Sequence, residues 1–425
     1  MLSTIYSISA LLVSVAILCL GHGLNNTVLS MRATLENYPD WVMGVMTSGY
    51  FVGSVLGALY CARIIPIIGQ IRAFAAFASI ASAISLLHVM YINEISWILL
   101  RVTYGFCVTA LYMVVESWLN GLSKKSNRGR VLSTYMTVNF LALSCGQMFV
   151  FMAEPTEYIL FAVVSVLISL SLVPLSLTKA KPPEVMNSEH LSFKELFKIS
   201  PLATIGCISV GLSSGAFWGL SGVYFTKIGL PAHDVATLIS LTFFGGLVFQ
   251  WPIGICSDRF DRRKVIATVL AAMTLVTFVF AFFVRDHVSE ISYGLMALSF
   301  FLGGFAYTLY SLFISLANDF LKPRQVIKAS SGLIIFHAFG AIAGPIFASN
   351  MMGLMGSSGL FQYMFTVNLI VFIFALMRIA AGRKIPKETS DPFVSVPKTS
   401  ASFGLVDLDP RQEFRESELK KPDVE

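Results

Sequence analysis

One stretch decides the fold: it reads DVATLISLTFFGGLVFQWPIGICSDRFDRRKVIATVLAAMTLVTFVFAFFV over residues 234–284. It contains two apolar runs, 234–256 and 264–284, with a short basic segment between them. A helix that spans a bilayer needs about 20 mostly apolar residues, because each residue advances the helix by only ~1.5 Å. Both runs reach that length. The stretch therefore predicts a hairpin of two membrane-spanning helices.

The same pattern extends over most of the chain. Of the 425 residues, 56% are hydrophobic and only 13% are charged, whereas a soluble protein is about 45–50% apolar. Such an excess needs lipid as the main solvent. We therefore expect an all-α membrane protein with twelve transmembrane helices, near residues 5–30, 41–65, 71–92, 95–119, 129–152, 157–178, 201–226, 234–256, 264–284, 290–316, 326–352 and 359–381.

Composition also divides the chain into parts. A polar break with two prolines separates the first six predicted spans from the other six, and a charged segment without long apolar runs follows the last span. We expect an N-terminal six-helix half (1–178), a cytoplasmic linker (179–200), a C-terminal six-helix half (201–382) and a disordered cytoplasmic tail (383–425).

The two halves repeat each other. Glycine pairs eight residues apart recur at an offset of 197, and a Gly, Tyr and Asn set recurs at an offset of 198. The matched positions are Gly49 and Gly57 with Gly246 and Gly254, then Gly105, Tyr112 and Asn120 with Gly303, Tyr310 and Asn318. Nearly equal offsets indicate a duplicated six-helix unit, and hence two pseudo-symmetric halves as found in alternating-access carriers.

The basic residues between the spans set the orientation. With the amino terminus inside, nearly all loop Lys and Arg residues fall on the inner side, and the outer loops hold only Arg32, Lys227 and Arg285. Since cytoplasmic loops carry an excess of Lys and Arg, we expect both termini in the cytoplasm. The protein would be a multi-pass protein of the plasma membrane, or of the inner membrane in a Gram-negative bacterium. Nucleic-acid binding is not expected, because no basic stripe is present despite the net charge of +6.

The sequence shows no sign of an enzyme. The six cysteines lie in or beside apolar runs without metal-ligand spacing, and no phosphate-binding loop, dinucleotide fingerprint or nucleophile elbow is present. We expect no catalytic residues, no metal and no cofactor. The expected partners are lipid and a small-molecule substrate, and the protein is expected to act as a monomer.

The basic segment quoted at the start carries a family signature. Residues Gly254, Asp258, Arg259, Arg262 and Arg263 follow the pattern G-x-x-x-D-R-x-x-R-R, which resembles the loop motif of the major facilitator superfamily. The alternative is an ordinary cytoplasmic loop. The resemblance implies the major facilitator fold and a gating role for these five residues.

The copy of this motif in the first half departs from the family pattern. Cys61 stands where the aspartate is usual, so a charge latch there is in doubt. The stretches Arg72-Ala73-Phe74 and Glu116-Ser117-Trp118-Leu119-Asn120 are similar to the YcaD-like bacterial branch of the superfamily, and this resemblance covers residues 5–382.

The fourth predicted span carries a polar stripe. At 100° per residue, Arg101, Tyr112 and Glu116 share one face of the helix. Arg101 either serves function inside the bundle or extends to the outer interface, and both readings stay open. With Gly105, it resembles a family motif whose arginine is linked to proton coupling in antiporters. Glu116 resembles a gating glutamate that would pair with Arg128, with proton carriage as the alternative.

The predicted cavity is lined by polar and aromatic side chains of four spans. His22, Asn25 and Asn26 lie near the middle of the first span, where polar groups need partners. They either line a cavity or bond neighbouring helices. The aromatic residues of the seventh and tenth spans either form a wall of the cavity or serve in packing and contact with lipid. His337 is expected to be a packing residue. With Arg101 and Tyr112, the predicted cavity set is completed by Trp218, Tyr224, Tyr307 and Tyr310.

These features predict a secondary active transporter that moves a small organic solute by alternating access. Proton coupling stays open, because the spans carry no carboxylate near the middle of the bundle; the coupling group would be His22, Glu116, Asp234 or Asp319. The alternative from another class is a non-transporting membrane receptor or scaffold that recruits a partner through the tail.

Overall fold

The computed structural model describes residues 2–123, 128–177, 193–284, 288, 290–321 and 326–381, with the backbone alone for 2–7, 128 and 326–328. Within these residues, twelve helical segments are long and apolar enough to cross a membrane. The twelve predicted spans are thereby confirmed. The predicted tail (383–425) and residues 179–192 of the predicted linker lie outside the described residues.

The helices form two groups of six spans. The first group comprises α1 (Leu2–Leu35), α2 (Asp40–Ile68), α3 (Gln70–Met90), α4 (Glu94–Leu122), α5 (Arg128–Gly146) with the 3-10 helix η2 (Gln147–Met152), and α6 (Ile159–Leu170) with α7 (Leu172–Ser176). The second comprises α9 (Pro201–Lys227), α10 (Ala232–Arg259), α11 (Arg262–Phe282), α12 (Tyr293–Asn318), α13 (Val326–Met355) and α14 (Gly359–Ala380).

Three elements differ from the prediction. The fifth span ends as a 3-10 helix, and the sixth is interrupted at Ser171, between α6 and α7. Pro174 explains the second interruption, because its ring conflicts with the carbonyl four residues earlier, which belongs to Leu170. The predicted linker also contains a short helix, α8 (Phe193–Ile199).

Glycines of the repeat hold equivalent helix pairs together in the two halves. A Cβ added at Gly105 would overlap the backbone of Tyr50, so α4 lies directly against α2. Its repeat partner Gly303 does the same in α12, against the carbonyl group of Thr242 in α10. A side chain at either position would force the helices apart. The repeat seen in the sequence is therefore a repeat of helix packing.

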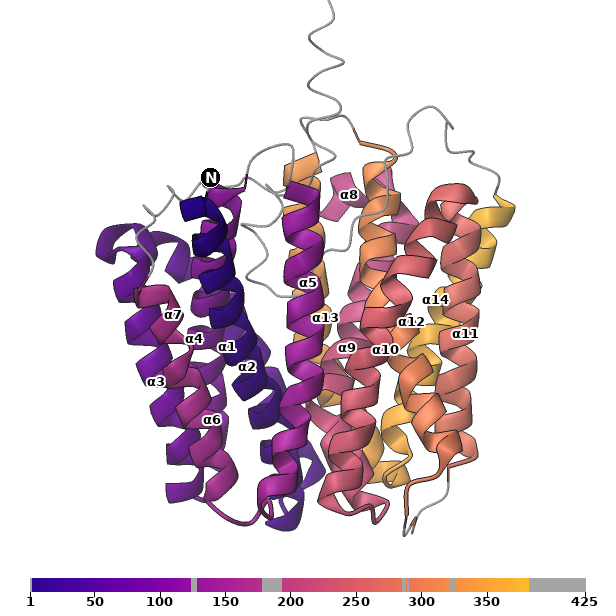
Figure 1. The fold of residues 1–425 in the computed structure, drawn as a ribbon. Coiled ribbons are helices and arrows are strands. Elements are labelled where there is room, and N and C mark those ends of the chain that lie inside the picture. Colours follow the sequence, from indigo (N-terminus) through magenta and orange to yellow (C-terminus); the bar gives the residue numbers. More distant parts are fainter. Residues whose placement is uncertain are drawn as a thin grey trace, which may run out of the picture.

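The two halves lie side by side in one bundle, as Figure 1 shows. Helices α1, α2 and α5 of the first half contact α9, α10 and α13 of the second. The amino terminus and α8 lie at the same end of the bundle, called here the linker end, and the α1–α2 turn lies at the other, called the far end. Many large apolar side chains on the outer surface of the bundle are exposed, as expected for a surface that faces lipid.

Candidate functional site: a cavity between the halves

A cavity of about 1090 Å³, counting the part open to solvent, lies between the two halves. Its walls come from α1, α2, α4 and α5 in the first half and from α9, α10, α12 and α13 in the second, near the middle of each helix. The lining residues are His22, Tyr50, Phe51, Ser54, Thr109, Tyr112, Met136, Asn139, Phe140, Leu143, Ser214, Trp218, Phe243, Gln250, Tyr307, His337, Ala338 and Ala341. Such a wall of aromatic, aliphatic and polar side chains suits a small organic ligand.

His22 is the centre of a buried cluster at one side of this cavity. Its Nδ1 lies 3.4 Å from the Tyr104 hydroxyl and its Nε2 lies 3.3 Å from the Tyr50 hydroxyl. The imidazole ring also lies against Trp218 of the other half, with ring centres 5.4 Å apart. The cluster therefore joins α1, α2 and α4 to α9 across the boundary between the halves.

A second, smaller hollow of about 260 Å³, counting any part open to solvent, lies next to this cluster, towards the far end. Arg101 and Asn26 line it together with Ser30 and Thr47. The Arg101 guanidinium donates from Nη2 to Asn26 Oδ1 at 3.1 Å and lies 4.7 Å from the centre of the Tyr50 ring. Arg101 is 2% exposed. The Arg101 side chain is therefore buried among the helices, and its functional role stays a prediction.

The far ends of the halves are held together by contacts that cross between them. Asn26 Nδ2 donates to the Trp218 carbonyl, and Asp40 forms an ion pair with Lys227. The Ser48 hydroxyl donates to the Ile342 carbonyl at 2.6 Å. We call this set of contacts, with the close approaches described next, the far-end closure.

Two glycines of α9 bring the halves into direct contact. An added Cβ at Gly219 would lie 2.6 Å from Thr47 Cβ, and one at Gly222 would lie 3.1 Å from Ser30 Cβ. Both distances are shorter than ordinary van der Waals contact. The halves fit together at the far end because these positions lack a side chain.

The predicted cavity residues separate into three groups. His22, Tyr112, Trp218 and Tyr307 line the central cavity, whereas Asn26 and Arg101 line the smaller hollow. The other three line neither. Asn25 is fully buried in α1, Tyr310 packs on His337 behind the wall with ring centres 4.9 Å apart, and Tyr224 packs on Phe361 inside the second half at 4.7 Å.

His337 differs from the expectation of a packing residue, because it lines the cavity and its Nε2 lies 3.4 Å from the Ser214 hydroxyl. Sequence reasoning also missed Tyr50, Asn139 and Gln250. The two amides carried a usable signal, since polar side chains in the middle of a span need partners. Tyr50 carried none, because tyrosine is equally common in helix packing.

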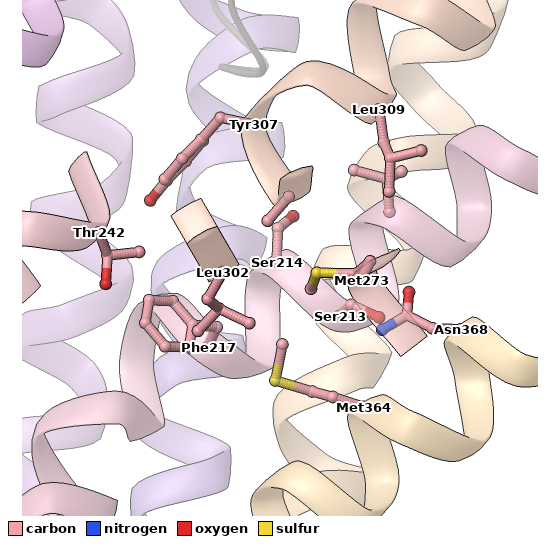
Figure 2. Close-up of a pocket in the computed structure, with 12 residues that line it drawn as sticks. Ser213, Ser214, Phe217, Thr242, Met273, Leu302, Tyr307, Leu309, Met364 and Asn368 are labelled. Atoms are coloured by element: carbon pink, nitrogen blue, oxygen red, sulfur yellow. The ribbon is translucent and has the colours of Figure 1, made fainter. Parts of the chain in front are cut away.

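A third hollow lies inside the second half and shares Ser214 and Tyr307 with the central cavity. It has about 420 Å³ of space, counting any part open to solvent, and its walls are mostly apolar. Figure 2 shows it between Phe217 and Thr242 on one side and Asn368 on the other, with Met273 and Met364 between them. The two cavities are therefore neighbours that share part of one wall.

The predicted gate residue Glu116 is fully buried at the linker-end part of α4 and accepts a hydrogen bond from the Tyr135 hydroxyl at 2.9 Å. Tyr135 belongs to α5 of the same half. The side chain of Arg128, its predicted partner, lies outside the described residues. The Glu116–Arg128 latch stays a prediction.

In the predicted gating motif of the second half, Arg262 has partners within its own half, and the gating role of the motif stays a prediction. Arg262 is buried, forms an ion pair with Asp319 of α12 and donates to the Ser315 carbonyl at 3.0 Å. It also bonds Ser257 Oγ at 2.9 Å and Asp258 at 3.3 Å. These bonds hold the α10–α11 turn to α12 within the second half.

The remaining members of the motif have different surroundings. Gly254 is buried in α10, whereas Arg259 is exposed. Arg263 bonds Asp261, which caps α11 by accepting from the Arg263 amide at 3.0 Å. Burial raises the pKa of Asp261, but the hydrogen bonds and the charge of Arg263 outweigh it, and the net pKa lies below its usual value.

Within the described residues, no three His, Cys, Asp or Glu side chains are grouped so that they could hold a metal ion. Two similar six-helix halves that enclose a cavity at mid-depth are the architecture of helical membrane carriers. Comparison with known proteins places the chain within this class. It matches the sequence pattern of the Major Facilitator Superfamily over residues 6–226 and again over 203–415. The chain belongs to this superfamily, whose members are transporters and not enzymes.

Individual relatives agree with this assignment. An uncharacterized MFS-type transporter, YcaD of Escherichia coli strain K12 / DH10B, is 26% identical over 380 residues, which are 89% of this chain and 96% of the relative. YcaD of Escherichia fergusonii is 25% identical over 389 residues, or 91% and 97% of the two chains. The branch resemblance seen in the sequence is confirmed.

Solved structures show the same fold. The nucleoside transporter NupG superposes with a TM-score of 0.72 at 14% identity, over 89% of this chain and 99% of NupG. A bacterial homolog of the human lysosomal transporter Spinster gives 0.68 at 15% identity, over 91% and 98%. At this identity the likeness concerns the fold and not the substrate.

Proposed function

We propose that this protein is a secondary active transporter that moves a small organic solute by alternating access of the central cavity to the two sides of the membrane. The observation that carries the proposal is the cavity itself. It lies at mid-depth, both halves supply its walls, and the contacts that close it towards the far end cross between the halves.

These contacts can open without unfolding either half. The Asp40–Lys227 pair is partly exposed, and such pairs contribute only about 0–1 kcal/mol. The Ser48 and Asn26 bonds exchange readily for bonds to water. Within each half, Gly105 and Gly303 place helix backbones in direct contact. The halves would therefore move as two rigid bodies, with the division near residues 179–200 as the connection.

Orientation follows from the positive-inside rule. With the linker end in the cytoplasm, the far-end closure faces the outside of a plasma or inner membrane. Glu116 and the Asp258–Arg263 turn then lie near the cytoplasmic mouth, where a gate would act. A proton-coupled cycle would use His22, Glu116, Asp234 or Asp319, and flux under an imposed pH gradient would decide it.

Alternating access can be tested without knowing the solute. Ser214→Cys, placed on the cavity wall in a variant that lacks the six native cysteines, should react with a membrane-impermeant thiol reagent from either side. Reaction is measured separately in right-side-out cells and inside-out vesicles. A scaffold with one fixed conformation would react from one side or from neither.

A disulfide that joins the two halves near the far end supplies the mechanistic control. The Ser144 and Ser240 hydroxyls lie 2.8 Å apart and belong to different halves. After oxidation of a Ser144→Cys/Ser240→Cys pair, reaction of Ser214→Cys from outside should stop, and reduction should restore it. The matched pair is Ser82 and Ser165, whose hydroxyls lie 2.7 Å apart within one half. Its oxidation should leave outside labelling intact, and equal loss with both pairs would refute the rocking of the halves.

A further inference from the structure

Arg101 is a buried cation without an acidic partner. No described residue supplies a carboxylate to it, and its Nη1 atom is buried without any hydrogen-bond partner. The other buried arginines differ. Arg32 pairs with Glu36 at 2.6 Å, and Arg262 pairs with Asp319. Among the buried arginines of the described residues, Arg101 is therefore the one whose charge no acidic side chain balances.

Such a group is costly to keep inside a membrane bundle. A buried charge is normally paired and hydrogen-bonded, because removal from water is not otherwise offset. The Tyr50 ring and the Asn26 amide oxygen compensate Arg101 in part. Neither carries a negative charge. Arg101 also lines the smaller hollow, together with Asn26, Ser30 and Thr47.

The other polar groups of this hollow are already engaged. The Ser30 hydroxyl donates to the Thr27 carbonyl at 2.9 Å, and the Thr47 hydroxyl donates to the Met43 carbonyl at 2.9 Å. Asn26 Nδ2 donates to the Trp218 carbonyl. Arg101 thus provides the free donor and the charge, which together suit an oxyanion.

We propose that Arg101, assisted by Asn26, binds the anionic group of the transported solute, so that the substrate is an organic anion. This inference rests on the proposed transport function and adds the substrate class. The head group would lie at this hollow once the far end opens, because the closed hollow is narrow. The central cavity next to it, with Tyr50, Trp218 and Phe243 in its wall, accommodates an apolar or aromatic body.

The same residues connect anion binding to the far-end closure. Asn26 accepts from Arg101 in α4 and donates to the Trp218 carbonyl in α9 of the other half. When the far end opens, that carbonyl leaves, and the Asn26 amide is free to donate to an anion held by Arg101. The anion therefore binds best in the open state and is released as the Trp218 carbonyl returns. Charge recognition and the conformational change share one amide group.

The test compares acids with their neutral amides on the full-length protein in detergent. The probes are benzoate, phenylacetate and indole-3-acetate, each with its amide, and binding is measured from the dose-dependent rise of the melting temperature. The acids should bind at least tenfold more tightly than the amides. Arg101→Gln should reduce this acid-to-amide ratio by roughly 10- to 150-fold, the range for a lost hydrogen bond to a charged group. Arg101→Lys should retain much of the ratio.

Two further variants keep the test decisive. Asn26→Asp places a carboxylate beside the guanidinium, so it should abolish acid binding even if Arg101→Gln does not fold. Acid and amide are compared within the same variant, so a loss of folded protein affects both measurements alike. Arg32→Gln is the matched control, because that arginine already has an acidic partner, and it should leave the ratio unchanged.

The outcomes separate this inference from the transport function. Equal binding of acids and amides, or an acid preference that survives both Arg101→Gln and Asn26→Asp, would overturn the anion site. The anion site would also be overturned if no probe binds while Ser214→Cys still reacts from both sides. In that case the transporter proposal stands. Reaction of Ser214→Cys from one side alone would remove the transport function, on which the inference depends.

Discussion

Gly219→Ala tests how the halves fit at the far end. An added methyl group would lie 2.6 Å from Thr47 Cβ and closer still to its γ atoms. Thr47 cannot easily rotate away, because it is β-branched and its hydroxyl is bonded to the Met43 carbonyl at 2.9 Å. Overpacking of this kind costs about 1–3 kcal/mol. The cost applies to the closed far end alone, since opening separates α9 from α2.

The expected result is a shift of population towards the far-end-open state. At about 1.4 kcal/mol per tenfold change, the ratio of open to closed should rise roughly 5- to 150-fold. The rate at which Ser214→Cys reacts from outside reports this ratio while the open state is the minor one. Reaction from the cytoplasmic side should slow as the open state becomes dominant.

Gly206→Ala is the matched control for this prediction. Its added methyl group would overlap the Phe313 ring, but both residues belong to the second half and keep their contact in either state. It should lower the melting temperature without changing the ratio of outside to inside labelling. Pairing Gly219→Ala with Thr47→Gly should return labelling towards the wild-type rate. The reasoning is refuted if Gly219→Ala leaves the ratio unchanged or alters it no more than Gly206→Ala does.

Three further changes test individual contacts. Asp319→Asn should destabilise the protein by about 3–5 kcal/mol, because Arg262 loses its buried partner. The loss is measured as a lower melting temperature in detergent. Asp258→Asn removes a more exposed contact of the same arginine and should cost less than about 1 kcal/mol. Lys227→Ala should raise outside labelling of Ser214→Cys by no more than about fivefold, and high salt should reproduce much of this effect in the wild type. Asp261→Ala should lower the free energy of unfolding by about 0.5–2 kcal/mol through loss of the α11 cap. The pKa of Asp261 is lowered in the folded protein. Its contribution to stability is therefore complete above the ordinary carboxyl pKa and disappears as the pH falls through the lowered value.

The sequence was sufficient for the spans and the repeat, for a physical reason. In lipid each helix must satisfy its own backbone, so the length of an apolar run translates directly into a span. The cavity wall depends instead on how the helices are rotated and which faces meet across the halves. Tyr307 and Tyr310 lie three residues apart on α12, yet the first lines the cavity and the second lies behind it. Tyr224 turns into its own half for the same reason, towards Phe361, and no composition or period distinguishes these cases.

The repeat also shows that the two halves carry buried charges at different positions. At an offset of 197, Arg262 corresponds to Ile65, and at 198, Asp319 corresponds to Gly121. Both charges of the buried pair are thus absent from the first half, and Ile65 is buried where Arg262 is. This agrees with the cost of burying one charge without the other.

Arg101 shows the opposite distribution. At an offset of 198 it corresponds to Ser299, which is fully buried, and so the second half carries no charge at the equivalent position. His22 corresponds to Trp218 at an offset of 196. The second half has an internal ion pair that holds its own helices together, whereas the first half has a cation that the described protein leaves without an acidic partner. If the ion pair of the second half is structural, the unbalanced charge of the first half is the one available to a substrate, and the central cavity next to it has Trp218 of the other half in its wall.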